Sequence, residues 1–193
     1  RTLTLNELSK FLEEAKKLGY REYSMVLLMC TSRLTTQELR NMNWCDFFID
    51  ANNKIGLDVS SRGDTRRIVA IRQDVFDVLL NYRKCLGLPE NISPTETDPV
   101  FTNYMNERLS TTSMRKIVYQ ICENAGVKKI SPKDLTHMAT LMAMINKVPT
   151  NKLVEQGHFS SASILRKYEY AVEYLKDAAC EKINLPVEVN PAD

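Results

Sequence analysis

The stretch that decides the fold is residues 30–39, CTSRLTTQEL, which is followed at residues 43–46 by NWCD. Thr35 and Thr36 are hydroxyl residues of the kind that cap the first turn of a helix, and either can begin a short helix that ends near Met42. The segment before it, residues 23–30, is apolar on every side, which is typical of a buried helix. We therefore expect a buried helix, a turn and a short capped helix in this part of the chain.

The rest of the chain is also mostly helical in pattern. Capping residues and helical spacing predict further helices that begin at Thr4, Asp74, Ser110 or Thr111, Ser131 and Pro149, and a long last helix over residues 161–182. Between them, residues 47–59 and 68–71 are rich in β-branched and aromatic residues, and polar loops interrupt them. The expected fold class is mainly α with a small antiparallel β-sheet.

Size and composition limit the class of protein. The 193 residues are 44% hydrophobic and 26% charged, with 7 Pro and 6 Gly, which excludes collagen-like, low-complexity and wholly disordered chains. No apolar run approaches the roughly 18 residues of a membrane span. We expect one domain over residues 1–185 and a loose tail over 186–193. Because the chain starts at Arg1 rather than Met, we also expect an upstream part to be missing.

Charge and cysteine usage give weaker constraints. The formal net charge of +2 is too small to prove a nucleic-acid partner. The five cysteines are scattered singly, without a C-x-x-C pair, which argues against a disulfide framework and against a zinc site. Cys30 and Cys122 lie in apolar runs and are interpreted as core thiols. We therefore predict a reducing compartment such as the cytoplasm, and neither a metal nor a cofactor.

Several short motifs occur in the order found in one known family. The first stretch resembles T-G-L-R-x-x-E-L followed by R-W-x-D, the first signature of the tyrosine recombinases (phage integrases). Other matches are the end of a β-hairpin at residues 65–69, a strand start at 98–101, a T-P-H-D-L-R-H box at 131–137 and an L-G-H-S-S box at 153–161. Tyr168 follows His158 by ten residues, where the family places its nucleophile. The resemblance covers residues 4–175 and implies the catalytic domain of that family.

The resemblance implies phosphoryl transfer without a metal or cofactor. In the family, a tyrosine hydroxyl attacks a DNA phosphodiester and forms a 3′-phosphotyrosyl link. Two arginines and a histidine hold the non-bridging oxygens, and a lysine on the β-hairpin protonates the leaving oxygen. An upstream DNA-binding domain, expected to be absent from this chain, completes a clamp around the duplex.

The chain departs from the family at several of these positions. Lys133 replaces the histidine of the T-P-H-D-L-R-H box, and Thr136 replaces its arginine. Arg33 is one or two residues out of register with the first arginine, and the hairpin lysine falls near Ser61, beside Arg62. Only His158 and Tyr168 match cleanly. Because each missing donor costs roughly 100- to 1,000-fold in rate, the resemblance implies a recombinase fold with weak or no strand cleavage.

The expected partner is duplex DNA, and the domain is therefore expected to be DNA-associated. Candidate DNA contacts are the basic residues of the hairpin and of the last helix: Arg62, Arg66, Arg67, Arg166 and Lys167. These residues could instead lie on ordinary solvated surfaces. His137 is interpreted as a buried structural histidine. The last helix could also support self-association or dock on an active recombinase.

Two alternative functions stay open at this point. The chain could be an active site-specific recombinase that forms a 3′-phosphotyrosyl intermediate through Tyr168. It could also be a helical protein-interaction domain without a role on DNA, which the small net charge permits. Salt-dependent binding to a duplex would separate the last alternative from the others. A covalent adduct with DNA would separate an active enzyme from a binding domain.

Overall fold

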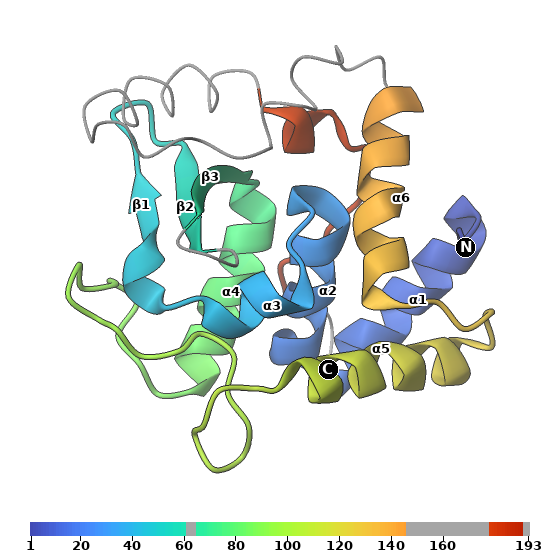
Figure 1. Cartoon of the computed structure of the whole chain (residues 1–193), viewed down its shortest axis with the longest axis horizontal. Coiled ribbons are helices and arrows are strands. Elements are labelled where there is room, and N and C mark those ends of the chain that lie inside the picture. The colour runs from blue at the N-terminus through green and yellow to red at the C-terminus, as the bar shows by residue number, and fades with distance from the viewer. Residues whose placement is uncertain (61–64, 146–177, 191–193) are drawn as a thin grey trace.

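The structure is a computed structural model that describes residues 1–60, 65–145 and 178–190. Helices dominate, and one small sheet follows the first three of them (Figure 1). The elements, in chain order, are α1 (Leu5–Leu18), α2 (Tyr20–Ser32), α3 (Thr36–Asn41), η1 (Trp44–Asp46), β1 (Phe47–Ile49), β2 (Ile55–Ser60), β3 (Arg66–Ile71), α4 (Gln73–Cys85), α5 (Thr111–Ala125), α6 (Pro132–Ile145) and η2 (Ala179–Lys182). The predicted fold class is confirmed.

Local side-chain chemistry explains where several helices begin. Thr4 and Glu7 form a reciprocal capping box at the start of α1, in which Glu7 N donates to Thr4 Oγ1 at 3.2 Å and Thr4 N donates to Glu7 Oε2 at 2.7 Å. Thr35 caps α3 in the same way, and Ser110 caps α5. These helix starts agree with the sequence predictions because the capping signals are local.

The sheet has the strand order β1-β2-β3, and both pairs of strands are antiparallel. Phe48 of β1 pairs with Gly56 of β2, and a Cβ atom at position 56 would lie 2.2 Å from the Phe48 ring. Glycine at position 56 therefore allows the aromatic ring to lie directly over the neighbouring strand. The predicted antiparallel sheet between the third and fourth helices is confirmed.

The centre of the molecule is α2, which has ten buried residues. It packs against α1, α4 and α6, and Figure 1 shows it in the middle with the sheet on one side and α6 on the other. The thiols of Cys30 and Cys122 are buried, as predicted, and burial raises the pKa of Cys30 to about 12. None of the helices within the described ranges has the length and apolar character that a membrane crossing requires.

The end of the chain differs from two predictions. Ala178 has an extended backbone and only the short 3₁₀-helix η2 follows it, so the predicted last helix does not run on to residue 182. Residues 161–177 of that helix lie outside the described residues. The predicted loose tail is also wrong for residues 186–190, because Val187 packs against the core and Val189 O accepts a hydrogen bond from Asn81 Nδ2 at 2.8 Å.

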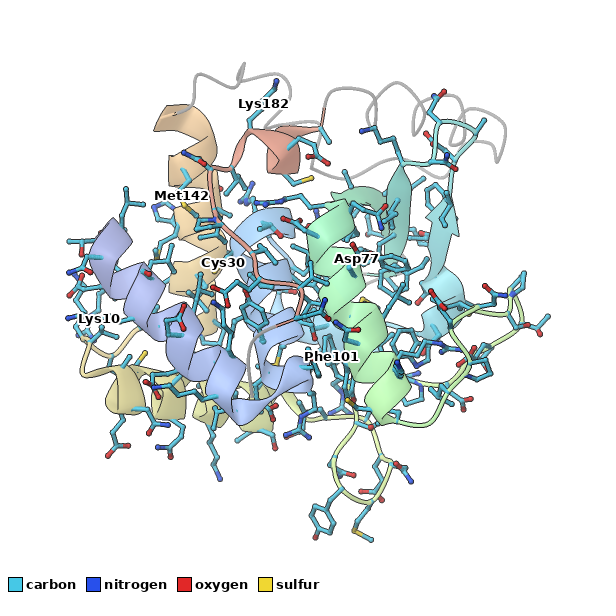
Figure 2. The ribbon with its side chains drawn as sticks, turned by 180° about the vertical axis from the view of Figure 1, so that it is seen from behind. Lys10, Cys30, Asp77, Phe101, Met142 and Lys182 are labelled. Carbon is cyan, nitrogen blue, oxygen red and sulfur yellow. The ribbon has the colours of Figure 1, made fainter. Side chains whose placement is uncertain are left out.

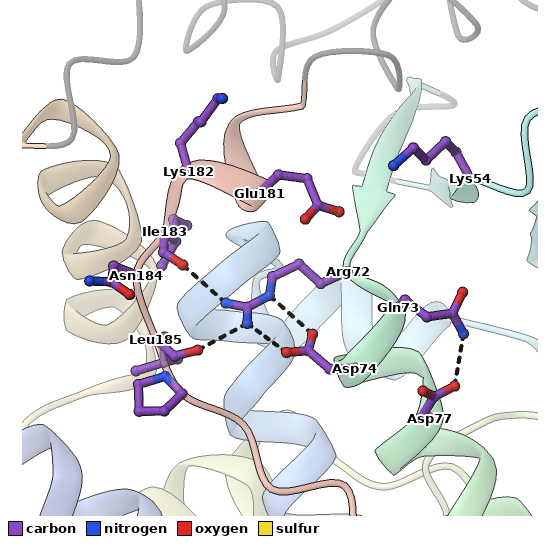
Figure 3. Close-up of a pocket in the computed structure, with 11 residues that line it drawn as sticks. Lys54, Arg72, Gln73, Asp74, Asp77, Glu181, Lys182, Ile183, Asn184 and Leu185 are labelled. Carbon is purple, nitrogen blue, oxygen red and sulfur yellow. Dashed lines mark hydrogen bonds and ion pairs between the residues drawn. The ribbon is translucent and has the colours of Figure 1, made fainter.

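We call residues 178–190 the C-terminal strap. Arg72 at the end of β3 holds it, donating to Ile183 O at 3.1 Å and to Leu185 O at 2.9 Å while a bidentate pair with Asp74 fixes the guanidinium (Figure 3). Further along, Glu188 N donates to Tyr23 Oη at 3.2 Å. The strap therefore lies on its own domain, which counts against the predicted docking of this end of the chain on a second subunit.

Candidate active site

Three segments that carry candidate site residues come together around α2. The last residue of α2, directly before the turn to α3, contacts the sheet, since Ser32 Oγ donates to Ala70 O of β3 at 3.0 Å. On its other side α2 packs along α6, whose first five residues include Lys133 and Thr136. The two views of the molecule agree on this arrangement (Figures 1 and 2). α2 thus lies between the sheet and α6, two of the elements that carry candidate site residues.

Arg33 occupies the turn itself. It is the C-cap of α2 and has a left-handed backbone with φ of 57°. Glycine is the residue that adopts this conformation most readily, so Arg33 stands where T-G-L-R-x-x-E-L has its glycine. Leu34 is then the buried leucine of the motif, and Thr35 is at the position of its arginine. The sequence left open which residue aligns with the first arginine of the motif, and the backbone favours Thr35.

The Thr35 side chain is fully engaged within the protein. Its Oγ1 accepts a hydrogen bond from Glu38 N at 3.2 Å and donates one to Glu38 Oε2 at 3.1 Å. Glu38 Oε2 also accepts a hydrogen bond from Thr35 N at 2.9 Å. Because a hydroxyl has only one hydrogen to donate, Thr35 has no hydrogen left for a phosphate oxygen in this conformation.

Arg67 was predicted to contact DNA, but it is buried in the interior of the protein. Its guanidinium donates to Glu38 through Nε at 3.0 Å and through Nη2 at 3.0 Å, and both side chains are buried. An arginine in the interior is expected next to a carboxylate, because a lone buried charge is costly. Sequence reasoning placed Arg67 on the surface because it assumed that all the hairpin arginines face solvent.

Arg66 is exposed, but it has acidic neighbours. It donates to Asp58 Oδ1 at 3.1 Å and lies 3.8 Å from Asp46, and the bond to Asp58 is the main cause that raises its pKa. Burial is the main cause that raises the pKa of Asp46. Arg62, the third predicted contact on the hairpin, lies outside the described residues. The surface around Arg66 is therefore less positive than the sequence suggests.

The start of α6 is built around a cap on Ser131. Asp134 Oδ2 accepts hydrogen bonds from Ser131 N at 2.7 Å and from Ser131 Oγ at 2.8 Å, and chiefly the backbone bond lowers the pKa of Asp134 to about 2. Lys133 is exposed, and Thr136 Oγ1 donates to Lys133 O at 2.9 Å. His137 is exposed, so the prediction that it is buried is wrong; it follows Thr136 on the outer side of the helix.

Four further predicted site residues belong to the later part of the chain. His158, Arg166, Lys167 and Tyr168 all lie outside the described residues. Among the residues that are described, no three His, Cys, Asp or Glu side chains are grouped so that they could hold a metal ion.

Sequence reasoning considered Lys128, Lys129 and Lys133 separately and did not identify the whole basic stretch around α5. Residues 111–137 contain five basic and two acidic residues, a net charge of +3 against +2 for the whole chain. The basic residues Arg115, Lys116, Lys128, Lys129 and Lys133 are all exposed. The charge of this segment, compared with that of the whole chain, was the signal that would have found it.

Comparison with known proteins gives a consistent result. The model of the phage integrase family matches residues 1–173. The chain is 31% identical to tyrosine recombinase XerC of Thermodesulfovibrio yellowstonii over 143 residues, which are 70% of this chain and 46% of that protein. It is 27% identical to tyrosine recombinase XerD of Staphylococcus aureus over 158 residues, 79% of this chain and 50% of that protein. The chain spans about half the length of these curated relatives.

Solved structures show the same fold. The crystal structure of XerA recombinase superposes with a TM-score of 0.68 at 22% identity and covers 89% of this chain and 60% of that chain. The catalytic core of lambda integrase superposes with a TM-score of 0.60 at 15% identity, covering 80% of this chain and 89% of that chain. XerH recombinase bound to its difH substrate before cleavage gives a TM-score of 0.64 at 20% identity, over 88% of this chain and 49% of that chain.

Proposed function

The chain belongs to the phage integrase family, and from that premise we propose that it is a duplex-DNA-binding domain of the tyrosine-recombinase type with weak or no strand cleavage. The observation that carries this proposal is the state of Thr35. Thr35 stands where the family motif has its first arginine, and its only hydroxyl hydrogen is donated to Glu38.

The same situation recurs at the second arginine position. Thr136 has no guanidinium, and its hydroxyl donates to the backbone of Lys133 within the same helical turn. Losing one preorganised donor to a developing oxyanion costs roughly 100- to 1,000-fold in rate, and a catalytic arginine in phosphoryl transfer is worth roughly 1,000- to 100,000-fold. Two such losses together account for impaired cleavage even if Tyr168 is correctly placed.

Lys133 compensates only in part. It is exposed at the start of α6 and carries a positive charge that can approach a phosphate. An ammonium group acts as a point charge, however, and lacks the two parallel N–H groups with which arginine holds two oxygens at once. Lys133 therefore supports DNA binding better than it supports stabilisation of a transition state.

The basic stretch over residues 111–137 supports DNA binding. Its net charge of +3 is exposed on α5, on the loop after it and at the start of α6, so the remainder of the chain carries a net charge of −1. Lys and Arg side chains bind DNA by releasing counterions from the phosphates, which makes the affinity depend steeply on salt. This uneven distribution explains how a chain of small net charge can still bind a duplex.

A nicked suicide substrate tests the cleavage part of the proposal. Such a duplex traps the covalent 3′-phosphotyrosyl adduct, which denaturing gels separate from free protein. We expect no adduct above that formed by Tyr168→Phe. An adduct that the unaltered chain forms and Tyr168→Phe abolishes would contradict impaired cleavage and identify an active recombinase.

Fluorescence anisotropy with a labelled duplex tests the binding part. We expect a dissociation constant of roughly 1–100 µM near physiological salt, with an affinity that falls linearly on a log–log plot against salt concentration. Replacing Arg115 and Lys116 by Ala should reduce the slope by roughly 1–2, since each contact releases about one counterion. Absent or salt-independent binding would instead favour a protein-interaction domain.

A further inference from the structure

The loop between α4 and α5 ends in a projecting hairpin, residues 102–109, which we call the tip loop. Tyr104 and Met105 stand at its end and expose 94% and 62% of their surface. Figures 1 and 2 both show this loop leaving the body of the molecule at the lower edge, close to α5. Because these two adjacent side chains are exposed, they contribute little to the stability of the domain and are accessible to a binding partner.

The tip loop is ordered by its own hydrogen bonds. Asn103 N donates to Glu107 O at 2.9 Å, and Asn103 Oδ1 accepts from Met105 N at 2.9 Å and from Glu107 N at 3.0 Å. Asn106 closes the turn with a left-handed backbone at φ of 61°. Because the backbone is held in this way, Tyr104 and Met105 are presented at little entropic cost to any partner that binds them.

The base of the tip loop is fixed to elements of the candidate active site. Arg108 Nη1 donates to Arg40 O at the end of α3 at 2.9 Å, and Arg21 Nη1 of α2 donates to Thr102 O at 2.9 Å. Directly after the loop, Ser110 caps α5, which carries the exposed Arg115 and Lys116. The tip loop is therefore held in a defined position next to the basic surface proposed to bind DNA.

The chemistry of the tip differs from that of this basic surface. It contains no free cation, because Arg108 is engaged with the backbone of α3, and its one carboxylate, Glu107 Oε2, accepts from Asn103 Nδ2 at 3.2 Å. Tyrosine hydroxyls are regular donors to phosphate oxygens, and apolar side chains contact sugars and groove walls. Such contacts add affinity without releasing counterions.

We infer that the tip loop is a non-ionic DNA contact, in which the Tyr104 hydroxyl donates to a phosphate oxygen and Met105 packs against the adjoining sugar edge. This inference rests on the proposed DNA-binding function and adds a contact of a different kind to it. It predicts a contribution to affinity that is separable from the salt dependence.

The test is anisotropy with the 193-residue chain, a labelled mixed-sequence duplex and a series of salt concentrations. The variant Tyr104→Ala/Met105→Ala should bind roughly 2- to 10-fold more weakly, the range expected for one lost hydrogen bond with its packing. The slope against salt should stay that of the unaltered chain. Ile49→Ala is the matched control, because Ile49 on β1 has the same 62% exposure as Met105, and it should bind as the unaltered chain does.

The experiment separates failure of the tip-loop inference from failure of the proposed DNA-binding function. If the unaltered chain binds no duplex at all, the proposed function fails before the tip loop is tested. If it binds and the tip variant binds equally well, the inference is overturned while the proposed function stands. A smaller salt slope in the tip variant would also overturn the inference, because the lost contact would then be ionic. So would sedimentation showing that the unaltered chain self-associates and the tip variant does not, because the tip loop would then form a protein interface.

Discussion

Glu38 of α3 and Arg67 of β3 form a two-point ion pair in the interior, 29 positions apart in the chain, with Nε–Oε1 and Nη2–Oε2 distances of 3.0 Å each. The same carboxylate caps α3 through Thr35. The pair therefore connects the β-hairpin to the α2–α3 turn, the two segments on which the family places its lysine and its first arginine.

Replacing Arg67 by Met should remove a buried positive charge that contacts the Glu38 carboxylate at two points. We expect the free energy of unfolding to fall by about 3–5 kcal/mol, as is typical when one partner of a buried pair is removed. Urea unfolding followed by circular dichroism measures this change. Arg66→Met is the control: it removes a neighbouring arginine from an exposed pair and should cost no more than about 1 kcal/mol. Equal losses for the two variants would contradict the importance of the buried pair.

Removing the Arg72 side chain should release the C-terminal strap from the body of the domain. Arg72→Ala deletes the donors to Ile183 O and Leu185 O, so amide hydrogens of residues 183–190 should exchange with solvent faster than in the unaltered chain. Hydrogen exchange read by mass spectrometry measures this. Lys182→Ala, an exposed residue in the same segment, should leave the exchange unchanged. Unchanged exchange in Arg72→Ala would mean that the other contacts of the strap, such as the bond from Asn81 to Val189 O and the burial of Ile183 and Leu185, hold it without Arg72.

The parts of the fold that the sequence predicted well are those with local causes. The side chains of Thr4, Thr35 and Ser110 each accept a hydrogen bond from the backbone N–H three residues later and so cap their helices. The short apolar strands are likewise separated by polar turns. The strap was mispredicted because its causes are distant. Arg72 reaches Leu185 across 113 positions, and no local pattern at either residue indicates that contact.

In the candidate site, too, local features were predicted and distant contacts were not. The motif spacing identified Thr35, Lys133 and Thr136, and the left-handed backbone of Arg33 then favoured one register among those left open. Arg67 was placed on the surface because a basic hairpin is usually solvated, whereas its partner Glu38 lies in a different element. An inward arginine can be found from sequence only when its carboxylate partner is already known.

The stability of the start of α6 should depend on pH through Asp134. Its pKa is about 2 in the folded protein against 3.8 for the free residue, chiefly because Ser131 N donates to it. A lowered pKa means that the carboxylate stabilises the fold above about pH 4 and that this contribution is lost as the pH falls towards 2. Asp134→Asn should therefore be less stable by about 1–2 kcal/mol at pH 7, and the difference should shrink below about pH 4 and vanish only below about pH 2. Urea unfolding across this pH range measures the difference, and a constant difference at every pH would contradict the assignment.

Restoring the missing charges should restore some cleavage. Thr35→Arg and Thr136→Arg supply the guanidiniums that the family motifs place there, and Lys133→His supplies the histidine. Thr35 is exposed and Thr136 half-buried, so the longer side chains have room. Because Thr35 caps α3, its replacement should also cost about 1 kcal/mol of stability. We expect the triple variant to form covalent adduct with a nicked substrate at least ~100-fold above the background signal of the unaltered chain, given the contribution of one such donor.

Two further variants make this result interpretable. Tyr168→Phe in the triple background should abolish the adduct, which would show that the restored chemistry uses the family nucleophile. Lys116→Arg in the unaltered chain is the control for side-chain type: it adds a guanidinium on the exposed face of α5 and should yield no adduct. If the triple variant keeps a cooperative thermal transition, binds the duplex and still forms no adduct, the defect lies elsewhere than at Thr35, Lys133 and Thr136. That outcome would direct attention to the position of the hairpin lysine near Ser61, where Arg62 is a poor proton donor because a guanidinium hardly deprotonates.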